Sequence, residues 1–266
     1  MIDSAPMKRP NILVIAGHDP SGGAGIQADI EAAAANGAHA ATVITLLTCQ
    51  DTTNVHGVEA VAADFFDRCL ETALADMDFA VIKVGVIANA EQVMRIVDLA
   101  ERLPDVPLVV DPVLRAAGGG TLADDSVGQA LRDHLFAHAD VVTPNAGEAR
   151  LLCDGEADID RCGARLSANG RCALITGGDE GDGEVINREY VAGEPREMHR
   201  WPRLPGVFHG SGCTLASALA AQLAHGHDRA TAVRLAQAYV WRTLDNAFAA
   251  GSGQRIPARI QPAREP

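Results

Sequence analysis

The chain has 266 residues, 47% of them hydrophobic, and a formal net charge of −13. This length and apolar content are enough for one large α/β core, and the acidic balance argues against a nucleic-acid or anionic-membrane partner. No stretch has the long uncharged apolar run of a membrane span, and residues 1–10 lack the apolar core of a signal peptide. The six cysteines lack paired spacing, so we expect reduced thiols in a cytoplasmic protein.

Apolar strands alternate with helical segments, which predicts an α/β fold with a mostly parallel central sheet and helices on both faces. The expected strands are 12–16, 41–47, 80–84, 108–111, 140–143 and 173–176, with an edge hairpin at 184–191 and 196–201. The expected helices are 24–36, 64–75, 90–102, 124–138, 145–153, 158–168, 213–224 and 230–248. Residues 1–10 are expected to be an extension, 11–250 one domain, and 251–266 a loose tail rich in Gly, Pro and Arg.

The first strand runs directly into the glycine-rich loop Gly17-His18-Asp19-Pro20-Ser21-Gly22-Gly23-Ala24-Gly25. Open α/β sheets bind ligands at such strand–loop–helix junctions. The loop has neither the G-x-G-x-x-G spacing of a dinucleotide site nor the Gly-Lys-Ser/Thr of a Walker A loop. Asp29, in the helix that follows, is a candidate hydrogen-bond acceptor for a ligand, and the alternative is a first-turn acid that complements the helix dipole.

Three polar positions follow later strands. Lys83 ends a buried strand, where it either faces phosphate or pairs with an acid. Asp111 stands at the carboxyl end of an apolar strand, suited to a metal or phosphate site or to capping the next loop. Asn145 and Glu148 have the spacing of a capping box.

The segment His209-Gly210-Ser211-Gly212-Cys213-Thr214 places a thiol and several backbone N–H groups at the start of a long Ala/Leu-rich helix. Small residues let an anion approach the backbone, and the first N–H groups of a helix have no intrahelical partner. A thiol in this place is expected to have a lowered pKa and to serve as a base. The alternative is a glycine-rich cap beside an inert, packed cysteine.

Taken together, these segments resemble the hydroxymethylpyrimidine and phosphomethylpyrimidine kinases of thiamin biosynthesis, which belong to the ribokinase-like superfamily. The resemblance runs in order from about Asn11 to Asp245. It is carried by residues 16–29, 43–45, 50–52, 83–85, 110–113, 143–148 and 209–215. It implies a three-layer αβα fold and a Mg²⁺- and ATP-dependent enzyme that phosphorylates 4-amino-5-hydroxymethyl-2-methylpyrimidine and then its monophosphate.

The resemblance also implies roles for individual residues. Cys213 matches the family's base, which is an aspartate in most ribokinase relatives, and Gly210, Ser211 and Gly212 match the anion hole. The predicted pyrimidine-binding residues are Asp29, Gln50, Gly17, Ala24, Val86 and Val113. The predicted nucleotide and phosphate residues are Asp111, Asn145, Thr176, Gly178, Lys83 and Arg115, with Glu148 and Asn145 at the metal.

Two stretches depart from the family pattern. Thr176-Gly177-Gly178 stands where many pyrimidine kinases have Lys-Gly-Gly, and Arg115 begins a glycine-rich stretch that replaces Ala-Lys-Ser-Gly. Arg115 is the expected substitute cation. A pyridoxal-type vitamin B6 kinase and a non-catalytic pyrimidine-binding sensor stay open as alternatives, although Gln50 and Cys213 favour the pyrimidine kinase. The expected partner is a small-molecule substrate, and a homodimer is left open.

Overall fold

The computed structural model describes residues 9–114, 125–181 and 183–260. Within them one nine-stranded sheet has the order β3-β2-β1-β4-β5-β6-β7-β8-β9. The strands are β1 (Asn11–His18), β2 (His39–Gln50), β3 (Val55–Ala60), β4 (Val81–Val84), β5 (Leu108–Val110), β6 (Val141–Val142), β7 (Cys172–Ile175), β8 (Glu184–Val191) and β9 (Glu194–Pro202). The pairs from β2 to β7 are parallel, whereas β3 and the β8–β9 hairpin pair antiparallel at the two edges. The predicted mostly parallel sheet is confirmed.

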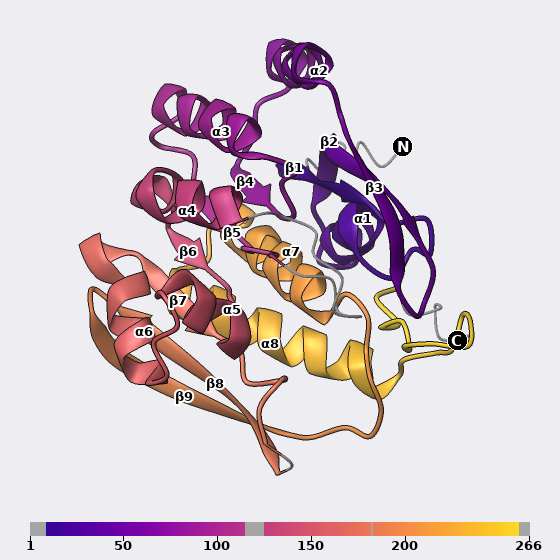
Figure 1. Cartoon of the computed structure of the whole chain (residues 1–266), viewed down its shortest axis with the longest axis vertical. Coiled ribbons are helices and arrows are strands. Elements are labelled where there is room, and N and C mark those ends of the chain that lie inside the picture. The colour runs from indigo at the N-terminus through magenta and orange to yellow at the C-terminus, as the bar shows by residue number, and fades with distance from the viewer. Residues whose placement is uncertain (1–8, 115–124, 182, 261–266) are drawn as a thin grey trace, which may run out of the picture.

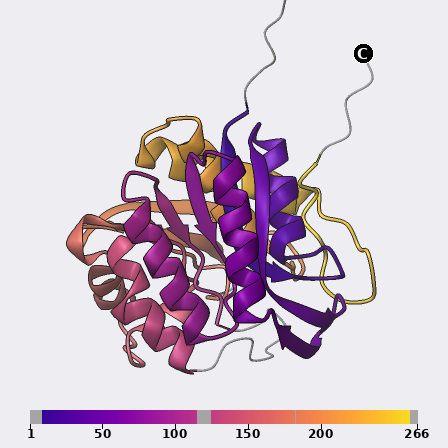
Figure 2. The same cartoon turned by 90° about the horizontal axis from the view of Figure 1, so that it is seen from above.

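Helices cover both faces of the sheet (Figures 1 and 2). Leu13 and Ile15 of β1 belong to one apolar core and Ile12 and Val14 to the other, as strand alternation requires. The helices over the Leu13 face are α2 (Ala63–Asp76), α3 (Ala90–Arg102), α4 (Asp125–Asp133), α5 (Ala146–Leu152) and α6 (Ile159–Leu166). Those over the Ile12 face are α1 (Gly25–Ala35), α7 (Ser211–Ala224) and α8 (Arg229–Asp245).

Helix α7 is the buried centre of its layer. Every side chain from Leu215 to Ala221 is at most 5% exposed. A helix that is apolar on all sides must be covered on all sides, and α7 packs against the sheet, α1 and α8. Its first turn is therefore held in a fixed place. None of the described helices is long and apolar enough to cross a membrane.

Most predicted elements are present within one to three residues of their expected ends. Strand β3 was not predicted, because its sequence is short and polar and it lies at an exposed edge. The helix expected at 124–138 ends at Asp133, and a 3-10 turn, Leu135–His138, follows. The last helix ends at Asp245 rather than at residue 248, and Phe248 forms a bridge with Ile256 instead.

The composition of residues 251–266 predicts a loose tail. The part of it that the structure describes, residues 251–260, is instead packed against the domain. Its backbone pairs at Arg255 with Phe208 and at Ile256 with Phe248. Ile256 is 4% exposed and Arg259 is 2% exposed. The segment follows α8 and reaches the side of the sheet that carries β2 and β3 (Figure 1). Residues 251–260 are thus packed against the domain, and the predicted domain boundaries themselves stay a prediction.

Candidate active site

A cavity of about 840 Å³ opens at the carboxyl ends of the parallel strands. Its wall is formed by residues at or after the ends of β1, β5, β6 and β7, together with the first turn of α7. This is the edge where open α/β sheets place their ligands, and the volume suits an ordinary small-molecule site. Fourteen of the predicted residues lie together in this wall: Gly17, Ala24, Gln50, Val86, Asp111, Val113, Asn145, Glu148, Thr176, Gly178, Gly210, Ser211, Gly212 and Cys213.

The start of α7 forms an anion site. Gly210 caps the helix in the left-handed conformation, with φ 74° and ψ 21°, and as a glycine it provides no side-chain cap for the first N–H groups. A Cβ atom at Gly210 would stand 1.9 Å from the Gly23 carbonyl oxygen. Only glycine fits both the dihedral angle and the close approach. The N–H groups of the first turn and the positive end of the helix dipole therefore face the cavity, as a phosphoryl group requires.

The pKa of the Cys213 thiol is not lowered, as the sequence predicts, but raised. Burial, together with the smaller effects of the Asp111 and Asp29 carboxylates, raises its pKa to about 12, which outweighs the lowering by the Lys83 ammonium. The expected lowered pKa is therefore corrected: the Lys83 ammonium does lower it, but desolvation is the larger effect. At neutral pH the group is a thiol, and only its small thiolate fraction is a strong base.

Asp29 and Lys83 form a buried ion pair beneath the cavity. Lys83 Nζ donates to Asp29 Oδ1 at 2.8 Å, and both side chains are 0% exposed. The Ser217 hydroxyl donates to the same oxygen at 2.6 Å. Burial opposes the charge on Lys83, but Asp29, Cys213 and Asp111 raise its pKa, so it stays an ammonium.

Neither member of this pair lines the cavity. The predicted contacts of Asp29 with the pyrimidine and of Lys83 with a phosphate stay predictions, although in the structure the two polar groups contact each other. Of the two alternatives for Lys83, the structure shows the ion pair with an acid. The Lys83 ammonium lowers the pKa of the Cys213 thiol, and the carboxylates of Asp29 and Asp111 oppose this effect.

Asn145 and Glu148 form the predicted capping box at the start of α5. The Asn145 side chain accepts from Glu148 N at 2.8 Å, and Glu148 Oε2 accepts from Asn145 N at 3.0 Å. Burial raises the pKa of Glu148 to about 8, with a further contribution from Asp111. Burial and Asp29 raise the pKa of Asp111 to about 6 against the opposing effect of Lys83.

These carboxyl groups fit a divalent cation. Asp111 Oδ2 is buried and has no hydrogen-bond partner among the described residues. Asp111 and Glu148 repel one another, as the raised pKa of Glu148 shows. A hard cation with oxygen ligands between them would offset both the repulsion and the burial. The residues present therefore suit Mg²⁺.

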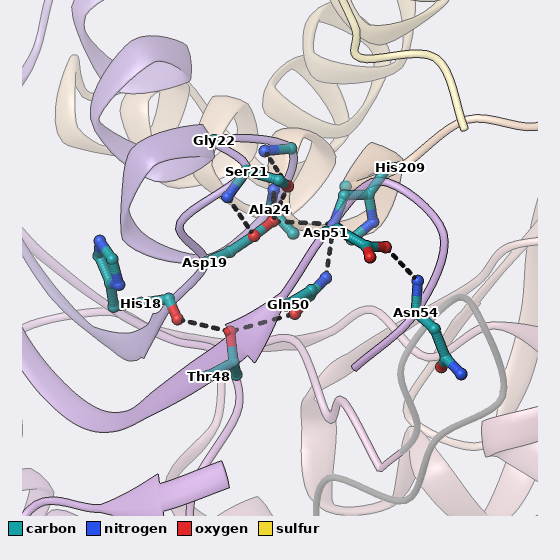
Figure 3. A network of polar contacts seen from close by, with 12 residues as sticks. His18, Asp19, Ser21, Gly22, Ala24, Thr48, Gln50, Asp51, Asn54 and His209 are labelled. Atoms are coloured by element: carbon teal, nitrogen blue, oxygen red, sulfur yellow. Dashed lines mark hydrogen bonds and ion pairs between the residues drawn. The ribbon is translucent and has the colours of Figure 1, made fainter. Parts of the chain in front are cut away.

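A polar network around Gln50 forms one side of the cavity (Figure 3). The Gln50 amide nitrogen lies 2.8 Å from His209 Nε2, and the same ring nitrogen lies 2.8 Å from Asp19 Oδ2. Asp19 also accepts from Ser21 and from the Ala24 backbone N–H at 2.8–2.9 Å. Burial opposes ionisation of Asp19, but these donors outweigh it and lower its pKa.

The ionised carboxylate of Asp19 can only accept, so His209 Nε2 carries the proton. A protonated Nε2 cannot accept from an amide, and a half-turn of the Gln50 side chain presents its carbonyl oxygen to His209 instead. The Gln50 NH₂ group then faces the Thr48 hydroxyl, which lies 3.3 Å from the other end of the amide and donates to His18 O. Asp19 and His209 thus fix which end of the Gln50 amide a ligand meets.

The far end of the cavity is aromatic and amphipathic. Trp201 and Trp241 stack with ring centroids 6.5 Å apart. Gln237 accepts from Asn187 at 2.8 Å and from the Trp201 indole at 3.2 Å. Arg203 is the only lysine or arginine among the described residues that line the cavity, and it donates to the carbonyl of Gly178 at 3.0 Å.

Sequence reasoning missed this end, because its residues come from β8, β9 and α8 and share no local motif. His209 belongs to residues 209–215, which carry the family resemblance, but the sequence predicts no role for it. Its only local signal is its position next to Gly210. Arg203 also donates to the carbonyl of Gly177, so it brings positive charge next to Thr176. Arg115 lies outside the described residues.

Comparisons with known proteins agree with this geometry. The sequence profile of the phosphomethylpyrimidine kinase family matches residues 19–258. The hydroxymethylpyrimidine/phosphomethylpyrimidine kinase of Streptomyces coelicolor is 37% identical over 93% of this chain and 93% of its own length. The thiamine biosynthetic bifunctional enzyme TH1 of Arabidopsis thaliana is 37% identical over 94% of this chain, which spans about half the length of that relative.

Solved structures show the same architecture. The pyridoxal kinase of Staphylococcus aureus in complex with pyridoxal has a TM-score of 0.85 and 27% identity, over 94% of this chain and 93% of its own. The predicted ribokinase-like αβα fold is confirmed. From the extent of the profile match and the identity to full-length relatives, the chain belongs to the phosphomethylpyrimidine kinase family.

Proposed function

We propose that this chain transfers the γ-phosphoryl group of ATP to the hydroxymethyl group of 4-amino-5-hydroxymethyl-2-methylpyrimidine, and then a second phosphoryl group to the monophosphate. The observation that carries this proposal is a single cavity that joins three parts. Gln50 stands on the acceptor side, the α7 helix start with Cys213 lies at the transfer point, and Asp111 and Glu148 stand beside it. Family membership supports the reaction class.

The acceptor ring fits between Gln50 and small apolar walls. A Cβ atom at Gly17 would stand 2.7 Å from Val86 and 2.8 Å from Leu46, so the wall at Gly17 has no room for a larger residue. An amide offers one donor and one acceptor, which matches a ring nitrogen beside an exocyclic amine. The fixed amide of Gln50 therefore selects the aminopyrimidine edge.

Transfer requires in-line positioning and neutralisation of phosphate charge. The N–H groups of Ser211, Gly212 and Cys213 hold the transferring group, and the thiolate of Cys213 takes the proton of the acceptor hydroxyl. Glu148 and Asp111 would hold Mg²⁺, with Asn145 orienting Glu148, and the cation would neutralise charge on the nucleotide phosphates. The stacked tryptophans form an apolar surface for the base of the nucleotide, and Arg203 faces its phosphates.

A pyridoxal-type kinase is the second candidate function. The observation in its favour is the likeness to the Staphylococcus aureus pyridoxal kinase, at a TM-score of 0.85. Pyridoxal also carries a hydroxymethyl arm on a six-membered aromatic ring, but it lacks the amino group that Gln50 would meet. A non-catalytic sensor is disfavoured, because a pure binder has no use for the paired Asp111 and Glu148 carboxyls at an anion site.

Gln50→Ala is expected to weaken binding of the hydroxymethylpyrimidine about 10- to 100-fold, because buried polar groups on the ring and on His209 lose their partner, at about 1–3 kcal/mol. Binding of AMP-PCP should change less than about twofold, since the nucleotide end of the cavity is unaltered. Calorimetric titration of each ligand measures both effects. Thr53→Ala, at an exposed turn beyond β2, is the control. Equal losses for the two ligands would place the acceptor elsewhere.

Affinity for Mg²⁺ with AMP-PCP is expected to rise as pH increases from 6 to 9. The pKa of Glu148 is raised to about 8, so below that pH a proton on Glu148 competes with the cation, and the proton is released when the cation binds. Titration in buffers of different ionisation enthalpy measures the proton release. Glu148→Gln preserves a capping box and should remove most of the pH dependence. The same dependence in this variant would show that the titrating group is not Glu148.

A further inference from the structure

The side chain of Arg259 is fully buried although it lies near the end of the chain. Its Nε donates to the Thr214 hydroxyl at 2.8 Å, and its Nη1 donates to Gly22 O at 3.3 Å and to Glu31 at 3.1 Å. Its Nη2 donates to Gly23 O. A guanidinium is a planar fork with donors in fixed directions, so these bonds define the relative positions of the groups that accept them.

Those acceptors belong to the two halves of the site. Gly22 and Gly23 form the loop between Asp19 and Ala24, and Thr214 follows Cys213 in the first turn of α7. The Thr214 hydroxyl donates to Gly210 O at 2.7 Å, which continues the chain of hydrogen bonds to the helix cap. A Cβ atom at Gly210 would stand 1.9 Å from Gly23 O and 2.9 Å from Arg259 Nη2. The loop, the cap and the guanidinium therefore meet at one point.

The backbone of Arg259 is anchored on α8. The Tyr239 hydroxyl donates to Arg259 O at 2.9 Å, and Ala258 N donates to Thr243 O at 3.0 Å. Upstream, Gln254 N donates to Thr52 O at 2.8 Å, just beyond Gln50 at the end of β2. The segment thus connects α8, β2, the glycine loop and α7. Arg259 is the residue that contacts the glycine loop and α7.

We propose that Arg259 is a positioning residue for phosphoryl transfer, which sets the distance between the acceptor loop and the anion site on α7. This inference rests on the proposed function. Because transfer requires the acceptor oxygen in line with the phosphorus, a displacement of about 1 Å between the two halves can cost about 100-fold in rate. Arg259 lies just past residue 258, where the family match ends.

The test compares Arg259→Met, Arg259→Ala and Arg259→Lys with Arg255→Ala, an exposed arginine of the same segment. Removal of Arg259 leaves no unpaired buried charge, because the Glu31 side chain is 41% exposed. In Arg259→Met we expect kcat with the hydroxymethylpyrimidine to fall about 10-fold or more, while KM for ATP stays within about twofold. Guanidinium at non-denaturing concentration should restore part of the activity of Arg259→Ala, and Arg259→Lys should be intermediate.

Backbone hydrogen exchange without any substrate is the second measurement. Amides of residues 21–26 and 211–215 should exchange faster in Arg259→Met, and those of β4 and β5 should not. Normal kcat and normal exchange in this variant would overturn the proposal. So would a loss of kcat that parallels the unfolded fraction, with no recovery on addition of guanidinium. If the unmodified protein transfers nothing to the pyrimidine, the proposed function fails, and the exchange comparison still decides whether Arg259 holds the two halves.

Discussion

Cys213→Ala is expected to lower kcat for the hydroxymethylpyrimidine about 10²- to 10⁴-fold, the range for loss of a general base, and to change KM for either substrate much less. The N–H groups of the anion site remain in this variant, so binding survives. Steady-state rates and calorimetry measure the two effects. Cys69→Ala, a cysteine of α2 outside the cavity wall, is the matched control. Near-native turnover in Cys213→Ala would show that the base is another group.

The pH profile gives an independent reading of the same group. Burial raises the pKa of the Cys213 thiol to about 12, so its thiolate fraction increases about tenfold for each pH unit below that value. With the thiolate as base, kcat should therefore rise with pH from 7 to 10. Cys213→Asp, which introduces the base of most ribokinase relatives, should retain part of the activity with a flatter profile. A native profile that falls over this range would contradict the thiolate as base.

Lys83→Met is expected to lower the free energy of unfolding by about 3–5 kcal/mol, the range for removal of one partner from a buried ion pair. The loss is large because Asp29 and Asp111 then stay buried without their common cation. Urea unfolding followed by circular dichroism measures it. The exposed pair Arg68–Asp64, with side chains 65% and 74% exposed, is the control, and Arg68→Ala should cost less than about 1 kcal/mol.

The double variant Lys83→Met/Asp29→Asn separates the pair from a general effect of core substitution. Removal of both charges should recover part of the stability lost in Lys83→Met, so the two single losses should not add. Additive losses would show that the two side chains are energetically independent. The ion pair between Lys83 and Asp29 would then not be what stabilises the region beneath the cavity.

The sequence predicts the parts of the site that lie within continuous segments. The glycine loop after β1, the N-cap of α5 and the start of α7 each carry their own chemical signal, and strand topology brings all three to one edge. For this reason Gly17, Asn145, Glu148 and Cys213 could be placed in one cavity without coordinates. Their spacing along the chain does not matter, because the carboxyl ends of parallel strands meet.

Contacts between distant segments could not be predicted in the same way. Lys83 and Asp29 are 54 positions apart, Gln50 and His209 are 159 apart, and Arg259 and Glu31 are 228 apart. Whether Lys83 faces a phosphate or an acid depends on which helix covers β4, and this is a property of packing. The burial that raises the pKa of Cys213 likewise comes from surrounding elements, whereas its place at a helix start is visible locally.

The most direct test of the central claim is a product time course by mass spectrometry, with ATP, Mg²⁺ and either hydroxymethylpyrimidine, its monophosphate or pyridoxal as acceptor. The account predicts a pyrimidine monophosphate that forms first and is then converted to the diphosphate, with kcat/KM for the pyrimidine well above that for pyridoxal. Preferential phosphorylation of pyridoxal, or ligand binding without any phosphorylated product, would contradict it.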